Sequence, residues 1–270
     1  MTKAGSPPRR GAAPRASAKL AARAAPGKAA EAARRLDRCL AGLASLEERI
    51  AAIVAAIRGR IAFSTSLGLE DQALLHAIGA TTATFDIFML DTGRHFPETL
   101  ETLNESELRY GLKIRVVVPD AREVERLVAR DGVFGFRHAV ENRIGCCDVR
   151  KVRPLKRALS GASGWVTGLR RSQSKERATV PFAAFDPEHG LIKVNPIADW
   201  SLERVEAYVA ENRVPVNPLH AKGFPSIGCQ PCTRAIRPGE DIRAGRWWWE
   251  HEDGKECGLH NRPPRKDAAA

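Results

Sequence analysis

Two pairs of cysteines restrict how this chain can fold. Cys146 and Cys147 are adjacent in I-G-C-C-D-V-R-K, and Cys229 and Cys232 form a C-x-x-C about eighty residues later. Neighbouring cysteines have difficulty giving two sulfurs to one zinc ion, whereas the separate irons of a four-iron cluster accept adjacent thiolates. Spacing alone therefore favours an iron–sulfur cluster and leaves a zinc site or a redox disulfide open. A site shared by both pairs requires the fold to bring them together.

A fifth cysteine, Cys257, lies near the C-terminus in E-C-G-L-H. A nucleophilic cysteine must be partly thiolate near neutral pH, and nearby cations lower its pKa. Arg243, Arg246 and His260 are candidate cations. Cys257 is therefore a candidate nucleophile, although local sequence fits an ordinary exposed cysteine equally well. The sixth cysteine, Cys39, has no partner motif and is interpreted as a structural residue.

Short apolar strands alternate with helical patterns between residues 45 and 218. We expect a helix to start at the capping box of Ser45 and Glu48. Such alternation predicts a doubly wound, mostly parallel α/β sheet, and residues 45–218 are expected to form one nucleotide-binding domain. Residues 219–270 have no clear period and are expected to be an irregular C-terminal segment. The expected strands are 60–64, 84–90, 113–118, 164–169 and 191–197, and the expected helices are 45–57, 70–78, 97–110, one from 120 and 201–212.

The positive charge of the chain is concentrated at its N-terminus. Residues 1–35 hold nine Lys or Arg and one acid, and so account for +8 of the net +11. We expect residues 1–44 to be a basic, disordered tail, of a bacterial kind rather than a transit peptide. Because the basic residues do not form a stripe on a folded face, nucleic-acid binding is not expected as the main function.

Other features of the sequence indicate the cellular compartment in which the protein is expected. No apolar run is long enough to span a bilayer, and the N-terminus has no secretory h-region. Clustered cysteines in such a chain more often bind metal or do chemistry than form structural disulfides. We therefore expect a cytoplasmic protein without a membrane partner. Assembly into a homo-oligomer is compatible with the sequence.

Candidate anion-binding groups follow three of the expected strands. Ligands on doubly wound sheets bind beyond the carboxyl ends of the strands, where S-T-S-L-G and D-T-G-R both fall. The first loop lacks the G-K-[ST] of a Walker loop, and an ordinary βα turn is a simpler interpretation. Paired arginines, Arg170 and Arg171, end another strand and suit a phosphate or sulfate, although a solvated charge run fits equally well.

Taken together, six motifs make the chain resemble the assimilatory adenylyl-sulfate reductases of the adenine nucleotide α-hydrolase-like superfamily. The resemblance covers roughly residues 45–260, and the cysteine motifs in combination with E-C-G-L-H are highly specific to that family. The motifs are S-T-S-L-G-L-E-D, L-D-T-G-R, G-C-C-D-V-R-K, G-L-R-R-S-Q-S, G-C-x-P-C-T-R and E-C-G-L-H.

The resemblance implies a role for each motif. Cys146, Cys147, Cys229 and Cys232 would ligate a [4Fe–4S] cluster, and Lys151 would lie between cluster and substrate. Adenosine and its phosphate would be held by Ser64, Thr65, Ser66, Gly68, Leu90, Asp91, Thr92 and Gly93. The phosphosulfate would be surrounded by Arg171, Arg243, Arg246 and His260.

The implied reaction is the reduction of adenylyl sulfate to sulfite and AMP in sulfate assimilation toward cysteine. Cys257 would attack the sulfur and form an S-sulfocysteine, which reduced thioredoxin or a similar dithiol protein would cleave. Plant relatives carry a fused thioredoxin-like domain that this sequence lacks, so a separate reductant is expected.

Three rival interpretations remain at this point. The first is the same chemistry on 3′-phosphoadenylyl sulfate, whose reductases usually lack both cysteine pairs. The second is an ATP-using adenylating or thiolating enzyme, which typically carries S-G-G-x-D-S in its first loop. The third is a zinc-ribbon module that binds RNA, which leaves E-C-G-L-H unexplained.

Overall fold

The protein, seen in a computed structural model that describes residues 26–81, 83–250 and 258–259, is built around one six-stranded sheet. The strand order is β3-β2-β1-β4-β6-β5. Every pairing is parallel except that of β5 with β6, so the expectation of a mostly parallel sheet is confirmed. The strands are β1 Ile61–Thr65, β2 Asp86–Leu90, β3 Arg115–Val117, β4 Gly164–Val166, β5 Ala183–Asp186 and β6 Leu191–Val194.

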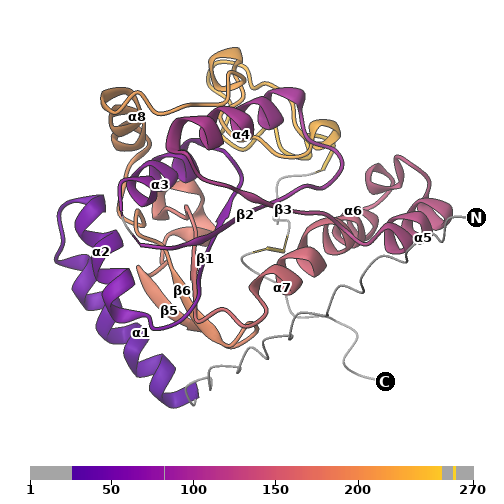
Figure 1. The fold of residues 1–270 in the computed structure, drawn as a ribbon. Helices are drawn as coiled ribbons and strands as arrows, with labels where there is room; N and C mark the ends of the chain where they lie inside the picture. The colour runs from indigo at the N-terminus through magenta and orange to yellow at the C-terminus, as the bar shows by residue number, and fades with distance from the viewer. Residues whose placement is uncertain (1–25, 82, 251–257, 260–270) are drawn as a thin grey trace, which may run out of the picture.

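Helices cover both faces of the sheet (Figure 1). Successive strand residues point to opposite faces, so Phe63 of β1 joins a core with α1, α2, α3 and α8, while Ala62 joins a smaller core with α7. Both faces are therefore apolar, as a doubly wound sheet requires. The helices are α1 Pro26–Ala41, α2 Leu46–Ala56, α3 Leu69–Gly79, α4 Pro97–Tyr110, α5 Ala121–Asp131, α6 Val140–Cys147, α7 Arg153–Leu159 and α8 Leu202–Glu211.

The expected N-terminal tail is wrong for residues 26–41, which form α1. Ala33, Leu36 and Leu40 are buried on one side of this alanine-rich helix. Asp37 accepts a hydrogen bond from the backbone N–H of Ala183 at 3.1 Å, so α1 covers the edge strand β5. An exposed sheet edge is a liability that such a helix removes, and this tertiary contact outweighs the polar composition. Residues 1–25 lie outside the described residues.

Two local expectations in this region have different outcomes. The capping box is confirmed, because the Ser45 hydroxyl accepts from the Glu48 N–H at 3.2 Å and the Glu48 carboxylate accepts from the Ser45 N–H at 3.1 Å. The interpretation of Cys39 as a structural residue is wrong, since its side chain is exposed on α1. Cys39 lies on the side of the helix that faces away from the core.

The sequence did not predict the helical stretch between residues 140 and 159. Here α6 passes through a π-helical turn, Asp148–Val152, into α7. A π-helical turn closes i→i+5 hydrogen bonds, so it interrupts the 3.6-residue apolar period on which helix prediction rests. The turn follows directly after Cys146 and Cys147, and it contains Lys151.

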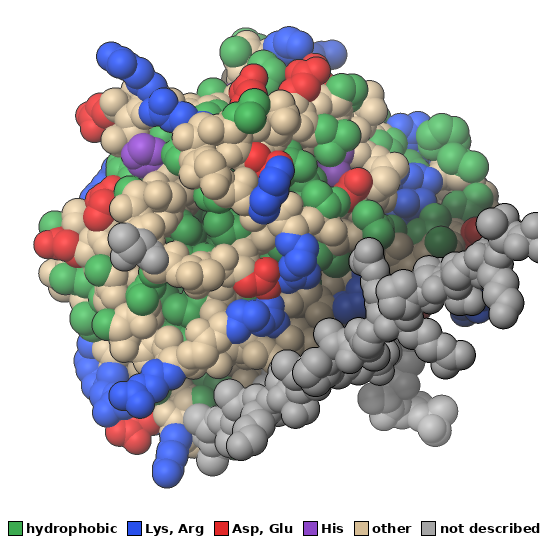
Figure 2. Space-filling view, in the orientation of Figure 1, with side chains coloured by type: hydrophobic (Ala, Val, Ile, Leu, Met, Phe, Trp, Pro, Cys, Tyr) green, Lys and Arg blue, Asp and Glu red, His purple; other side chains and the backbone are tan. Residues whose placement is uncertain are grey.

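In the described part of the C-terminal segment, residues 219–250 and 258–259, the regular structure is limited to two short 3-10 turns and one isolated bridge between Thr233 and Arg246, as expected for an irregular segment. None of the helices in the described ranges combines the length and apolarity needed to cross a membrane. On the face seen in Figure 2, Lys and Arg side chains are interspersed with Asp and Glu rather than gathered in one stripe.

Candidate functional site

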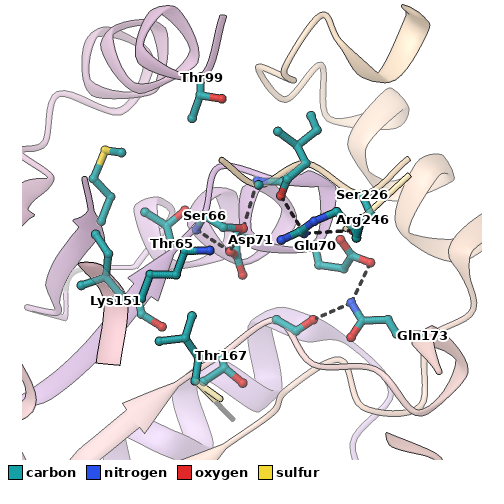
Figure 3. Close-up of a pocket in the computed structure, with 18 of the residues that line it drawn as sticks. Thr65, Ser66, Glu70, Asp71, Thr99, Lys151, Thr167, Gln173, Ser226 and Arg246 are labelled. Carbon is teal, nitrogen blue, oxygen red and sulfur yellow. Dashed lines mark hydrogen bonds between the residues drawn. The ribbon is translucent and has the colours of Figure 1, made fainter. Parts of the chain in front are cut away.

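A cleft of about 240 Å³ opens at the carboxyl ends of β1, β2 and β4. This is where ligands of doubly wound sheets bind. The first loop, the end of β2 and the C-terminal segment all contribute to its wall (Figure 3). The site residues expected from the sequence that line it are Ser64, Thr65, Ser66, Gly68, Leu90, Thr92, Lys151, Cys229, Arg243 and Arg246.

The S-T-S-L-G loop is held by its own side chains. The Leu67 N–H donates to the Thr65 hydroxyl at 3.0 Å, and Leu67 adopts a left-handed φ of 58°. The indole N–H of Trp165 donates to the Ser64 hydroxyl at 2.8 Å. The loop is therefore preformed, with several polar groups turned toward the cleft, which suits an anion-bearing ligand at the start of α3.

Asp71, which the sequence analysis did not single out, holds this loop through hydrogen bonds to Ser66. Its carboxylate accepts from both the N–H and the hydroxyl of Ser66, each at 2.6 Å. Burial raises the pKa of Asp71 to about 6, against the opposing effect of the Ser66 hydrogen bonds. An Asp three residues after a small-residue loop that opens a helix is the signal that could have identified it.

We expect the stability of the wild type, relative to an Asp71→Asn variant, to fall as pH rises from about 4 to about 6. The raised pKa means that the folded protein binds a proton that the unfolded chain has already released, so ionisation of Asp71 costs folding free energy in this window. The cost should reach about 3 kcal/mol above pH 6. Urea unfolding of both proteins across this range measures it. A difference that stays constant with pH would contradict the assignment.

Only two of the four residues of the L-D-T-G turn that were expected to bind the nucleotide line the cleft. Leu90 and Thr92 line the cleft, whereas Asp91 and Gly93 do not. The Asp91 carboxylate instead accepts from the Gly93 N–H at 2.8 Å, and Gly93 has a left-handed φ of 68°. These two residues therefore shape the turn that presents Thr92.

Arg171 is not at the cleft, and that expectation is wrong. Its Nε donates to the Val180 carbonyl at 2.8 Å, and its guanidinium lies 5.0 Å from the centre of the Phe182 ring. The adjacent Arg170 and the nearby Arg177 line the cleft instead. Of these two neighbouring arginines only Arg170 lines the cleft, and spacing alone does not tell which of the two it is.

Glu70 holds Arg170 in place at this end of the cleft. The guanidinium of Arg170 donates twice to Glu70, at 3.0 and 2.7 Å, and Gln173 donates to the same oxygen at 2.9 Å. Arg170 is 1% exposed, so its charge is largely balanced by Glu70. Arg170 is therefore better suited to shaping the wall than to neutralising an anion.

Three further cations from distant parts of the sequence line the cleft. Lys151 comes from the π-helical turn, and Arg243 and Arg246 come from the C-terminal segment. Arg246 donates to the Ser226 hydroxyl and the Ile227 carbonyl, each at 3.3 Å. Figure 3 shows Lys151, Ser66 and Arg246 around the same space.

Gly228 allows this arrangement. A Cβ atom at Gly228 would collide with the guanidinium of Arg246. Glycine before Cys229 therefore leaves the Arg246 guanidinium its observed position.

Cys146, Cys147, Cys229 and Cys232 line one small cavity beside the cleft. Cys229 borders both spaces, as do Lys151 and Trp247. Cys147, Cys229 and Cys232 are buried in an apolar cluster with Phe136 and Trp247. The structure thus brings together the two pairs that lie far apart in the sequence. Cys257 and His260 lie outside the described residues.

The charges around these thiols differ from one sulfur to the next. Burial raises the pKa of Cys229, but Lys151, a hydrogen bond with Thr92 and two arginines outweigh it, so the net shift is downward. The Thr92 hydroxyl lies 3.3 Å from the Cys229 sulfur. Burial and the neighbouring Cys229 raise the pKa of Cys232 to about 11, and burial also raises that of Cys146. Of these three thiols, Cys229, which borders the cleft, is therefore the one best stabilised as a thiolate.

Four thiols line this cavity, which is the number that a four-iron cluster takes. Across the described ranges, no group of three or more His, Cys, Asp or Glu side chains is arranged to hold a metal ion. The four thiols surround a space instead, with an apolar wall and the cations Arg94, Arg143, Arg150 and Lys151. Burial and hydrogen bonds to the sulfurs are the features by which proteins tune such clusters, and cations oppose their negative charge.

Comparison with known proteins agrees with this geometry. A family model described as a phosphoadenosine phosphosulfate reductase domain matches residues 60–235. A protein of Agrobacterium fabrum named adenosine 5'-phosphosulfate reductase is 53% identical over 225 residues, which are 83% of this chain and 86% of that protein. A protein of the same name from Allochromatium vinosum is 52% identical over 211 residues, which are 77% of this chain and 82% of the relative.

The fold also resembles a solved structure. The crystal structure of phosphoadenylyl-sulfate (PAPS) reductase from Candida auris, in a phosphate complex, superimposes with a TM-score of 0.64 at 27% sequence identity. The match covers 75% of this chain and 95% of that one.

Proposed function

Because this chain belongs to the phosphoadenosine phosphosulfate reductase family, we propose that it reduces adenylyl sulfate to sulfite and AMP with a dithiol protein as the electron donor. The observation that carries the proposal is that Lys151 and Cys229 border both the cleft and the cysteine cavity. A nucleotide site and a four-thiol site are thereby joined at one wall.

The cleft meets the charge requirement of this reaction. A thiolate must approach an anionic sulfuryl group, so fixed cations have to neutralise the sulfate and the leaving phosphate. Lys151, Arg177, Arg243 and Arg246 all line the cleft. We assign them to the phosphosulfate, together with His260. Adenosine would rest on the first loop, Leu90 and Thr92.

The proposed chemistry proceeds in two exchanges at Cys257. Its thiolate attacks the sulfur, a sulfur–sulfur bond forms, the bond to the phosphate oxygen breaks and AMP leaves. A thiolate of the reductant then attacks the Cys257 sulfur, and sulfite departs with the electron pair. The second thiol of the reductant resolves the mixed disulfide and restores Cys257. One dithiol is oxidised for each sulfite released.

We assign a [4Fe–4S] cluster to Cys146, Cys147, Cys229 and Cys232. Bound there, the cluster would supply a fixed, polarising charge centre beside the substrate, while both electrons come from the dithiol. Lys151, on the shared wall, would hold the sulfate oriented toward the attacking thiol. We place the enzyme in the cytoplasm, where thioredoxin keeps thiols reduced. We further divide the chain into a nucleotide-binding unit up to residue 218 and a segment, 219–270, that carries the C-x-x-C and Cys257.

The proposal is tested with purified protein, adenylyl sulfate and reduced thioredoxin. AMP and sulfite should appear in equal amounts, and 3′-phosphoadenylyl sulfate should be a poorer substrate by kcat/KM. Absence of both products from protein that carries its full iron would contradict the assigned activity. A preference for the 3′-phosphorylated substrate would instead favour the rival substrate on the same site.

Replacing Lys151 with alanine should lower kcat/KM by about a hundredfold. The substitution removes a cation from the wall between cleft and cysteines, where charge stabilisation in the transition state is worth several kcal/mol. Lys156→Ala is the matched control, because Lys156 is exposed on α7 a few residues away. Steady-state kinetics of the two variants decide the point, and equal losses in both would contradict a specific role for Lys151.

A further inference from the structure

A lysine ammonium lies over the ring of Trp165, a buried residue in the wall of the cleft. Trp165 of β4 and Lys193 of β6 are partners in the parallel register, so their side chains leave the sheet on the same face. The Lys193 Nζ atom is 4.7 Å from the centre of the indole ring. A cation at this distance is attracted by the ring quadrupole, and Trp is the aromatic residue that attracts it most strongly.

The turn between β5 and β6 holds the same ring from a second side. The His189 ring meets the Trp165 ring edge-on, with 5.5 Å between the two centres, and the Asp186 carboxylate accepts from Nδ1 of His189 at 3.0 Å. Burial lowers the pKa of Lys193 to about 8, with Arg177 adding to the shift and Asp186 opposing it. Lys193 is therefore mostly a cation at neutral pH, and the charge is lost under mildly alkaline conditions.

The polar edge of the indole meets the first loop. Its N–H donates to the Ser64 hydroxyl at 2.8 Å, and Ser64 lines the cleft. A serine hydroxyl has one O–H donor and two acceptor lone pairs. Because the indole of Trp165 occupies a lone pair, the Ser64 proton is directed to a different acceptor. An anionic oxygen at the start of α3 is the acceptor that this arrangement suits best.

A cation above the ring strengthens the donation to Ser64. The ammonium draws electron density toward itself, which makes the indole N–H more positive, and interactions linked in series polarise one another in a low-dielectric interior. Lys193 itself is not among the described residues that line the cleft. Its influence on a ligand there passes through Trp165 and Ser64.

We propose that Lys193 is a positioning residue that acts through Trp165 to fix the Ser64 hydroxyl as a hydrogen-bond donor to the phosphate of the bound nucleotide. This inference rests on the proposed function only in the choice of an adenine nucleotide as the ligand. Lys193 takes no part in bond making.

The test is the affinity of the full-length protein for AMP and for adenosine, measured by calorimetry at pH 7. Lys193→Met keeps an unbranched apolar stem but removes the charge, so it should bind AMP about tenfold more weakly and adenosine equally well. Lys193→Arg should bind AMP as the wild type does, because a guanidinium also stacks on an aromatic face. Arg204→Met is the matched control, since Arg204 lies 4.6 Å from the ring centre of Trp200, which is buried away from the cleft lining. This control should leave AMP affinity unchanged.

The pH dependence of AMP binding distinguishes a charge effect from a packing effect. Wild-type affinity should fall as pH rises from 7 to 9, because the Lys193 ammonium loses its proton near pH 8. Lys193→Arg should keep its affinity over this range, since its guanidinium stays charged. Asp186, Arg177 and His189, the other charged or titratable groups around the ring, are the same in both proteins, so their titration cancels in the comparison.

Each outcome decides the inference separately from the proposed activity. An unchanged AMP affinity in Lys193→Met, an equal loss of adenosine affinity, or a failure of Lys193→Arg to restore binding would overturn it. If Lys193→Met does not fold, identical pH profiles of the wild type and Lys193→Arg would overturn it instead. If AMP binding responds as expected but no sulfite is released from adenylyl sulfate, the inference stands and the assigned reaction fails.

Discussion

Changing Cys257 to serine should abolish sulfite release and lower kcat/KM by at least about a thousandfold. A thiol is partly ionised near neutral pH and is intrinsically a strong nucleophile, whereas a serine hydroxyl needs a base to act. The covalent step is therefore the one that the variant loses. Substrate binding should persist, because the described lining of the cleft is unchanged.

The measurement follows both exchanges separately. Incubation of the wild type with adenylyl sulfate and no reductant should leave a sulfonate on the Cys257 peptide, detected by mass spectrometry, and release one AMP. The variant should show neither product. Cys39→Ser is the matched control, since Cys39 is an exposed cysteine on α1, and it should react as the wild type does. Sulfite release by Cys257→Ser at the normal rate would end the proposed mechanism.

Replacing Cys232 with serine is expected to have the second largest effect, on cofactor content and stability together. The wild type, purified without oxygen, should be brown and hold about four irons per chain, and the variant should lose most of that iron. Because cluster binding contributes to folding, the variant should be destabilised by about 3 kcal/mol or more, a fall of roughly 10 °C in Tm.

Two comparisons make the result specific. Cys39→Ser should keep its iron and its Tm, because Cys39 is far from the four-thiol cavity in the sequence and exposed on α1. Iron and zinc are measured together in each sample by metal analysis. A colourless wild type that holds one zinc would show that the cluster assignment is wrong and would favour the zinc-module interpretation.

Individual site residues were predicted correctly where a whole loop lines the cleft. They were predicted wrongly where only one of two neighbouring side chains lines it. The S-T-S-L-G loop and Leu90 were placed correctly at the cleft. Arg171 was not, because the backbone turns its guanidinium toward Val180 and leaves Arg170 facing the cleft. Arg170 is the extended N-cap of a 3-10 helix that begins at Arg171, so the two side chains leave the backbone in different directions.

Buried polar residues were the other group that the sequence did not reveal. Asp71 looked like one of several acids at the start of a helix, and only its contact with Ser66 shows that it supports the loop. The α1 helix was missed for a related reason. Its polar composition resembled a tail, and its burial depends on an edge strand that lies some 140 residues later in the chain.

The sequence alone determined the parts of this protein that depend on neighbouring residues. The alternation of strands and helices, the capping box at Ser45 and the small-residue loop after β1 all follow from local periodicity and hydrogen bonding. The cysteine motifs also indicated a shared site before any geometry was known.

Only the tertiary structure decided which groups meet. It placed Cys146 and Cys147 beside Cys229 and Cys232, and put Lys151 on the wall between cavity and cleft. Contacts between residues far apart in the sequence depend on the order of the strands in the sheet and on the π-helical turn that joins α6 to α7. Local sequence patterns carry no information on either feature.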